Sequence, residues 1–179
     1  GVAVDASANV YVADTSNHTI RRITSAGLVT TFAGSGGTSG STDGPGNGAR
    51  FLYPNAVAVD SSGNVYVADT NNHTVRKITP TRVVSTLAGT AGISGSTDAT
   101  GAAARFNYPM GIAVGAAGVL VVADQFNHTL RSVSGAGVVT TLAGAAGVAG
   151  SANGPALQAR FNYPAGVAVD AAGRVYVAD

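Results

Sequence analysis

The sequence repeats itself at intervals of 55 residues. Aspartate, histidine, phenylalanine and proline all recur at this spacing. The recurring residues are Asp14, Asp69, Asp124 and Asp179; His18, His73 and His128; Phe51, Phe106 and Phe161; and Pro54, Pro109 and Pro164. A fixed period of this length is typical of propellers and other repeat arrays, in which each copy buries its faces against its neighbours. Packing between copies is therefore the first explanation for any residue that recurs.

The period also predicts the organisation of the chain. We expect a single repeat domain over residues 1–179, with copies at about 1–55, 56–110 and 111–165 and a partial copy at 166–179. The first and last fourteen residues, GVAVDASANVYVAD and GVAVDAAGRVYVAD, are the same segment of two different copies. We therefore expect the sequence to be part of a longer array.

Composition narrows the class of protein. The chain has 25 glycines, no cysteine and no tryptophan, which is typical of a β-rich protein with many turns. Its formal net charge is +1 and only 11% of its residues are charged, so we expect no nucleic-acid partner. No apolar run is long enough to cross a bilayer, and we expect no direct membrane insertion.

Each copy contains four short apolar or β-branched runs separated by turn residues. In the first copy the runs are residues 2–4, 10–13, 19–23 and 28–32, and the turns between them are 5–9, 14–18 and 25–27. This pattern predicts a four-stranded antiparallel meander with tight hairpins. The connection from about Gly34 to Arg50 is long and has no strand pattern, so we expect a surface loop.

The first two strands of each copy alternate little between apolar and polar residues, as expected when a sheet is covered on both faces. Stacking such sheets face to face gives an all-β propeller. In the third strand Arg21 and Arg22 lie between Ile20 and Ile23, and we expect this strand to lie toward the rim. The chain supplies about three and a half blades. The remaining blades of the same chain, or a second subunit, are expected to close the ring.

Two segments carry a family resemblance. VYVADTSNHTIRRIT at 10–24 and VYVADTNNHTVRKIT at 65–79 resemble the NHL repeat, and an ARFNYP…GVAVD segment recurs before the next unit. The resemblance implies a β-propeller, often of six blades, which would need roughly 330 residues at this period. The third copy departs from the pattern at Gly115, at Gln125-Phe126 and at Ser132, so we expect its local surface to differ.

The ionisable residues follow the repeat almost completely. All nine acidic residues are aspartates at recurring positions, and only Arg82 and Arg174 fall outside the period among the cations. A catalytic site needs different residues brought together once, whereas a structural role recurs with the fold. The sequence therefore predicts no catalytic residues and no cofactor.

The three histidines offer one alternative. Propellers of the peptidyl-hydroxyglycine lyases, which are related to this family, bind zinc through histidine, and His18, His73 and His128 could converge on a metal in the same way. Each of them, however, lies in the same Asn-His-Thr turn after the second strand, away from the innermost strand. We expect structural turn histidines that hydrogen-bond to backbone or to the preceding aspartate, and no metal.

Two other recurring sets have both a structural and a ligand interpretation. Asp14, Asp69 and Asp124 end the second strand, where they can cap a turn or form a ring of carboxylates. The second set, Arg50, Arg105 and Arg160, precedes an aromatic residue, where the guanidinium can bridge blades or bind a ligand. We expect the structural role, in the turn or between blades, for both sets.

The Asn-His-Thr turns are also acceptor sequences for N-glycosylation. Asn17, Asn72 and Asn127 are therefore glycosylation candidates if the protein enters the secretory route. Because one repeated motif generates all three, they count as little more than one observation. We expect an extracellular or cell-surface location.

Topology predicts a binding face. In an up-and-down meander the second turn and the long interblade loop emerge at the same end of the sheet. That end gathers loops 34–50, 89–105 and 144–160, which are rich in small hydrogen-bonding residues. The candidate binding residues there are Asn17, His18, Asn72, His73, Asn127 and His128. The alternative is that the long loops only fill the gaps between blades.

These observations favour a non-enzymatic interaction or structural module that presents a loop-lined face to a protein or glycan partner. The alternative is part of a propeller enzyme, of lyase or hydrolase type, with active residues partly outside this segment. RNA binding, which some NHL domains achieve through a basic face, is disfavoured because the loops contain scarcely any lysine or arginine.

Overall fold

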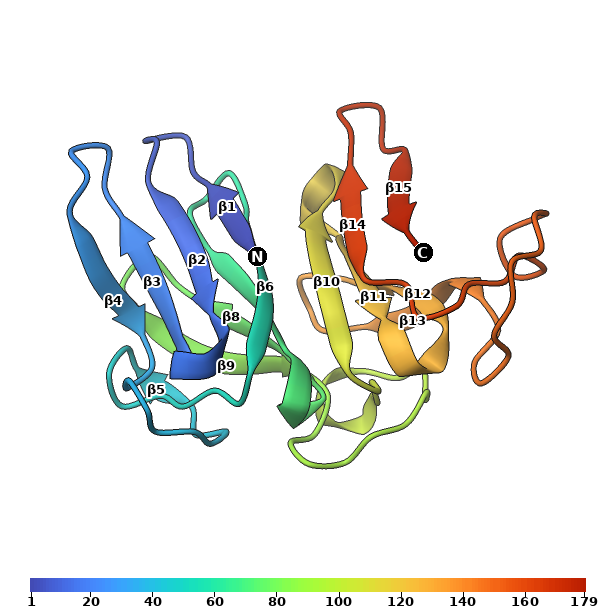
Figure 1. Ribbon diagram of the computed structural model, residues 1–179, viewed down its shortest axis with the longest axis horizontal. Helices are drawn as coiled ribbons and strands as arrows, with labels where there is room; N and C mark the ends of the chain where they lie inside the picture. Colours follow the sequence, from blue (N-terminus) through green and yellow to red (C-terminus); the bar gives the residue numbers. More distant parts are fainter.

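The computed structural model describes residues 1–179, the whole sequence, and consists of β-strands joined by turns, loops and short 3-10 helices (Figure 1). Three antiparallel sheets and a final hairpin follow one another along the chain. The first sheet contains β1 (Val2–Val4), β2 (Val10–Asp14), β3 (Thr19–Ile23) and β4 (Val29–Ala33). The second contains β5 (Gly44–Pro45), β6 (Pro54–Val59), β7 (Val65–Asp69), β8 (Thr74–Ile78) and β9 (Val83–Ala88). The third contains β10 (Pro109–Val114), β11 (Leu120–Asp124), β12 (Thr129–Val133) and β13 (Val139–Gly144).

The final hairpin pairs β14 (Gly166–Val169) with β15 (Val175–Ala178). A one-turn 3-10 helix joins the second and third strands of each complete sheet. These helices are η1 (Thr15–Asn17), η2 (Thr70–Asn72) and η5 (Gln125–Asn127); two others are η3 (Gly101–Ala103) and η4 (Ala116–Gly118). The prediction of an all-β fold built from antiparallel meanders is confirmed.

The sheets pack face to face as blades of an arc. The first strands lie next to one another, β6 against β1 and β10, and β10 against β14, so they form the inner side of the arc. Two clusters of 12 buried residues fill the spaces between successive blades, one centred on Phe51 and the other on Phe106. Both phenylalanines have no exposed surface, and they come from the loops that enter the second and third blades. Burial of apolar area between blades, worth about 25 cal/mol per Å², is therefore the main stabilising contribution.

The third strand lies toward the rim, as predicted, since in the order β1-β2-β3-β4 it is next to the outer fourth strand. The burial of its first basic residue was not predicted: this residue is fully buried in the second and third copies, where it is Arg76 and Arg131. Charged residues are mostly exposed unless they are paired, and these two arginines are paired with buried aspartates.

The long interblade loop does more than cover the surface. Gly44 and Pro45 form the short strand β5, which pairs antiparallel with Val84 and Val83 of β9 in the next blade. A single bridge between Thr100 and Val138 has the same role one copy later. The loop therefore runs as a strap from one blade onto the outer strand of the next, and the expectation of a loop without strand pairing was wrong for these residues.

The first hairpin of each blade depends on an aspartate and a tyrosine that occur together. Asp60 Oδ1 accepts hydrogen bonds from two backbone N–H groups, and Asp60 Oδ2 accepts from Asn64 Nδ2 and from the Tyr66 hydroxyl. The first and last copies repeat this arrangement. In the third copy Gly115 replaces the aspartate and Val121 replaces the tyrosine. Both partners are lost together, which indicates that they form one structural unit.

Candidate functional site

The second turn of each blade and the long interblade loops lie at one end of the sheets, at the bottom of Figure 1 for the first two loops. Backbone hydrogen bonds join them: Gly37 donates to Asn17 O, Gly92 to Asn72 O and Gly147 to Asn127 O. The predicted common end is therefore confirmed. We call this end the loop-lined face, and it comprises turns 15–18, 70–73 and 125–128 with loops 34–53, 89–108 and 145–163.

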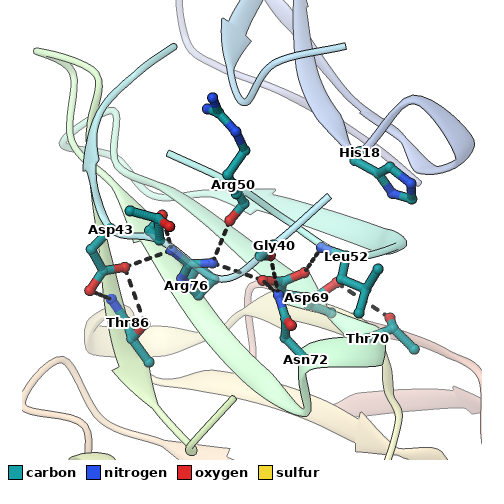
Figure 2. Close-up of polar contacts among 12 residues, drawn as sticks. His18, Gly40, Asp43, Arg50, Leu52, Asp69, Thr70, Asn72, Arg76 and Thr86 are labelled. Atoms are coloured by element: carbon teal, nitrogen blue, oxygen red, sulfur yellow. Dashed lines mark hydrogen bonds and ion pairs between the residues drawn. The ribbon is translucent and has the colours of Figure 1, made fainter. Parts of the chain in front are cut away.

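A buried ion-pair network lies beneath this face between the first two blades (Figure 2). The Arg76 guanidinium on β8 donates to Asp69 Oδ2 at 2.8 Å and to Asp43 Oδ1 at 2.6 Å. It also donates to the backbone carbonyls of Arg50 and Thr42. Because Asp43, Thr42 and Arg50 belong to the strap from the first blade, one buried side chain fastens that strap to the second blade.

Asp69 completes the network. Its carboxylate accepts from the backbone N–H of Leu52 at 2.8 Å, from Asn72 Nδ2 at 2.7 Å and from Arg76. Burial raises the pKa of Asp69, while Arg76 and the hydrogen bonds oppose that rise. With these contacts Asp69 holds the end of β7, η2 and the incoming loop together.

The same network recurs between the second and third blades. Arg131 pairs with Asp124 at 2.7 Å and with Asp98 at 2.6 Å. Burial raises the pKa of Asp124 to about 6, against the hydrogen bonds from Asn107, Asn127 and Arg131. In the first blade, Arg21 and Asp14 are 3.3 Å apart and both side chains are partly exposed.

The three histidines each join a turn of one blade to the loop that leads into the next blade. The Nδ1 atoms of His18, His73 and His128 accept hydrogen bonds of 3.1 to 3.2 Å from backbone N–H groups 35 residues further along the chain. The donors are Tyr53, Tyr108 and Tyr163, and each tyrosine ring lies edge-on to its histidine with ring centroids 4.7 Å apart. Because Nδ1 is an acceptor, the neutral ring carries its proton on Nε2.

The histidine turns require an unusual backbone. All three histidines have φ near +57° and the three tyrosines have φ between +50° and +59°, in the left-handed region. Such values are uncommon outside glycine and are kept where surrounding contacts demand them. Burial lowers the pKa of His73, which favours the neutral ring that can accept the hydrogen bond.

The candidate glycosylation sites differ in exposure. Asn17 is exposed, whereas Asn72 and Asn127 are 5% and 6% exposed. Asn72 Nδ2 donates to Asp69 Oδ2 and to Gly40 O, and Asn127 repeats this pattern with Asp124 and Gly95. A glycan on that nitrogen would break these hydrogen bonds in the folded protein, whereas Asn17 Nδ2 donates only to Asp14, in an exposed turn.

The interblade role predicted for Arg50, Arg105 and Arg160 falls to other arginines. Their guanidinium groups donate within their own loops, chiefly to carbonyls one and three residues back along the chain. Only the backbone carbonyls of Arg50 and Arg105 reach the next blade, where they accept from Arg76 and Arg131. The sequence pattern did not distinguish these roles, because both sets of arginines recur with the same period.

Sequence reasoning missed an aromatic row on the loop-lined face. Phe126 lies between Tyr108 and Tyr163, with ring centroids 4.6 Å and 5.3 Å apart. Phe126 is 43% exposed and Tyr163 is 51% exposed. The signal was present in the sequence, since the tyrosines recur every 55 residues and Phe126 marks a departure of the third copy from the repeat.

Three further observations concern other kinds of site. Within residues 1–179 no three or more histidine, cysteine, aspartate or glutamate side chains are grouped so that they could hold a metal ion. A cleft of about 330 Å³ opens between the inner strands, lined by Asn55, Met110 and mostly apolar neighbours. No helix is long and apolar enough to span a membrane.

These features define the class of protein: a β-propeller arc whose four-stranded units are joined by buried arginine–aspartate pairs and by histidine–tyrosine contacts. More particularly, two segments of the chain, residues 51–78 and 161–179, match the NHL repeat model. The NHL repeat-containing protein 2 of Bos taurus is 38% identical over 95 residues, which cover 51% of this chain and 13% of that protein. The matched region is thus a small part of that relative.

Solved structures extend the likeness over the whole chain. A protein of unknown function from Bacteroides thetaiotaomicron is 30% identical with a TM-score of 0.82, covering 99% of this chain and 44% of its own. At 19% identity and a TM-score of 0.74, an auxiliary nutrient binding protein from Bacteroides ovatus matches 98% of this chain and 44% of its own. A catalytically inactive variant of virginiamycin B lyase from Staphylococcus aureus matches 98% of this chain and 61% of its own at 15% identity and a TM-score of 0.52. The last two show that the fold is shared by a binding protein and an enzyme.

Proposed function

We propose that this chain is a non-enzymatic interaction module that presents its loop-lined face to a protein or glycan partner. The observation that carries the proposal is that the recurring ionisable groups beneath the face are engaged in joining blades. Arg76 has no exposed surface and makes four hydrogen bonds to protein groups, and Asp69 accepts three. Both side chains have no exposed surface, so a substrate could not reach them in the folded protein.

The histidines support the same interpretation. A general base needs a free nitrogen or oxygen within reach of a substrate, and a pKa near the working pH. His73 is 9% exposed and its Nδ1 already accepts a backbone hydrogen bond. The pKa of Asp124 is raised to about 6, but this side chain has no exposed surface.

The exposed apolar residues of the loop-lined face are suited to binding a partner. Ile93 and Val148 occupy equivalent positions in two successive loops and are 50% and 49% exposed. Tyr53, Phe126 and Tyr163 add exposed aromatic surface at the same end. Aromatic residues with few charges are typical of the centres of binding interfaces.

The alternative, part of a propeller enzyme of lyase or hydrolase type, rests on a likeness of fold alone. The virginiamycin B lyase variant shares the architecture at 15% identity, and fold does not determine function. An exported or cell-surface location, and closure of the ring by further blades or a second subunit, remain predictions of the sequence.

The test uses the natural full-length protein on an array of immobilised glycans and proteins. Val148→Arg places a charge on the loop-lined face, and Ser62→Arg is the matched control on an exposed hairpin at the opposite end of the blade. We expect V148R to lose binding that S62R retains. Mass spectrometry of the recovered partner should find it unchanged. Retained binding by V148R, or a partner that is chemically altered, would refute the proposal.

A further inference from the structure

The third copy departs from the repeat at neighbouring positions on the loop-lined face. Gln125 and Phe126 stand where the second copy has Thr70 and Asn71. The loop that follows has Asn153 where the two earlier loops have the aspartates that pair with buried arginines. A role shared by every blade cannot explain residues that occur in one copy only.

One of these changes, glutamine in place of threonine at position 125, removes a hydrogen bond between blades. Thr70 Oγ1 donates to Pro109 O at 2.7 Å, across 39 positions of the chain. The Gln125 side chain makes no hydrogen bond anywhere in residues 1–179. A buried hydrogen bond contributes about 1 kcal/mol to stability, so the third copy has lost stabilisation at this joint.

The neighbouring change gains exposed aromatic surface. Phe126 fills the space between Tyr108 and Tyr163, and His128 extends the row beyond Tyr163. The hydroxyl groups of Tyr108 and Tyr163 make no hydrogen bond within the protein, in contrast to the hydroxyl groups of Tyr11, Tyr66 and Tyr176. The row therefore combines ring surface with free donors and acceptors.

The backbone holds the row in place before any ligand arrives. Phe126 N–H donates to Asn107 O at 3.0 Å, and Gln125 N–H donates to Tyr108 O. Tyr163 N–H donates to His128 Nδ1 at 3.2 Å. Because these segments are fixed, a ligand that stacks on the rings pays little to order them.

The charge around the row selects the kind of ligand. Segments 107–110, 125–130 and 144–159 contain no aspartate, glutamate, lysine or arginine, and Arg160, three positions before Tyr163, donates to the carbonyls of Leu157 and Ala159 in its own loop. A nucleic acid or other phosphate-rich ligand needs cationic partners, and base stacking alone would leave its phosphates unpaired. An uncharged ligand with an apolar face and many hydroxyl groups matches ring surface flanked by amides and phenolic hydroxyls.

We propose that the aromatic row of Tyr108, Phe126 and Tyr163 is a binding site for a neutral oligosaccharide. The C–H face of a pyranose ring stacks on the electron-rich faces of the aromatic rings. The Gln125 amide and the tyrosine hydroxyls bond to its hydroxyl groups. This inference rests on the proposed function, since it names the class of partner and the part of the face that binds it.

The experiment titrates the natural full-length protein calorimetrically with cellohexaose, maltohexaose and mannohexaose, three neutral hexasaccharides of different linkage or sugar. We expect at least one to bind, and Phe126→Asn to raise its Kd by about tenfold, the effect of losing about 1.4 kcal/mol. F126N restores the residue type found in the second copy, so the fold should tolerate it. Ser62→Arg, on the exposed hairpin at the opposite end of the blade, should leave the Kd unchanged.

Two results would overturn the inference: none of the three hexasaccharides binds, or F126N binds as tightly as the natural protein. A thermal melt of F126N shows whether a loss of binding comes from unfolding. If V148R loses binding to a protein on the array and no hexasaccharide binds the natural protein, the oligosaccharide site fails while the proposed function stands. If the partner is chemically altered, the proposed function fails whatever the titrations show.

Discussion

Asp43 Oδ1 lies 2.6 Å from Arg76 Nη2, although the two residues are 33 positions apart and belong to different blades. The arginine side chain has no exposed surface and the aspartate side chain is 48% exposed. The pair therefore joins the surface strap of one blade to the interior of the next. Its repeat at Arg131 and Asp98 makes this contact a general feature of the arc.

Arg76→Leu should destabilise the fold by about 3–5 kcal/mol, because it leaves the carboxylate of Asp69 buried without its cation. The matched control is Arg21→Leu, at the equivalent position of the first copy. Its ion pair with Asp14 is partly exposed, so the cost should be about 0–1 kcal/mol. Urea unfolding of both variants measures the difference. Equal losses of stability in R76L and R21L would show that the contact between the strap and the buried arginine does not contribute to stability.

Asp124 should titrate with a midpoint of about 6, since burial raises its pKa. An unfolded aspartate has a pKa of about 3.9, so between pH 4 and 6 the folded chain binds more protons than the unfolded chain. The contribution of Asp124 to the free energy of unfolding therefore falls as the pH rises through this window. Carbon-13 NMR of the carboxyl groups locates the midpoint, and a value below 4 would contradict the prediction.

Asp98 provides the internal comparison for that titration. Burial acts to raise its pKa, but hydrogen bonds from Thr141 and from Arg131 outweigh this effect and lower it. Ionised Asp98 therefore stabilises the fold, in contrast to Asp124. This stabilisation is lost only as the pH falls below the ordinary aspartate range. The two carboxylates that share Arg131 should therefore titrate in separate ranges.

Tyr66 should ionise near pH 12, because burial and the hydrogen bond to Asp60 raise its pKa to about 12. Asp60→Asn removes the negative charge and should move the midpoint toward 10, the ordinary tyrosine value. Ultraviolet absorbance of phenolate measures the transition, with Tyr66→Phe identifying its contribution. An unchanged midpoint in D60N would show that burial alone sets the pKa.

His73→Ala should cost about 1–3 kcal/mol, because it leaves the backbone N–H of Tyr108 without its acceptor in a partly buried position. His18→Ala should cost less, since the equivalent Tyr53 N–H is exposed and can bond to water. Thermal unfolding compares the two variants. A larger effect at His18 would be inconsistent with a role that depends on burial.

Glycosylation, if the chain passes through a eukaryotic secretory route, should be confined to Asn17. The buried amides of Asn72 and Asn127 each donate both to an aspartate and to a carbonyl of the preceding loop, whereas the exposed amide of Asn17 donates to Asp14 alone. Intact mass before and after enzymatic removal of N-glycans, followed by peptide mapping, tests this. Sugars on Asn72 of a folded protein would contradict the buried placement of its amide.

The period and the turn residues were enough to predict the blades. The runs at 2–4 and 19–23 are strands in the structure, and apolar residues such as Phe51 fill the space between sheets as expected. The place of the third strand toward the rim was predicted, but the burial of its first basic residue was not. Arg76 is interior because Asp69 on the neighbouring strand pairs with it and Asp43 reaches it from a loop 33 positions away.

The candidate site was predicted only in part. The second turns and the long loops lie at the same end of the sheets because successive strands of a meander run in opposite directions. This arrangement could be deduced from the sequence. The aromatic row could not, because three residues from two copies meet only when neighbouring blades are stacked. A departure from the repeat, such as Phe126, is the signal that a sequence offers for a feature of this kind.

The most direct test of the structural account is a double-mutant cycle between Arg76 and Asp43, using R76L, D43N and the double variant in urea unfolding. If the pair joins successive blades, the coupling free energy should be about 0.5–3 kcal/mol, the range for residues that contact one another in one network. A coupling below about 0.3 kcal/mol, the scale of independent sites, would contradict the claim that recurring charged residues hold the blades together.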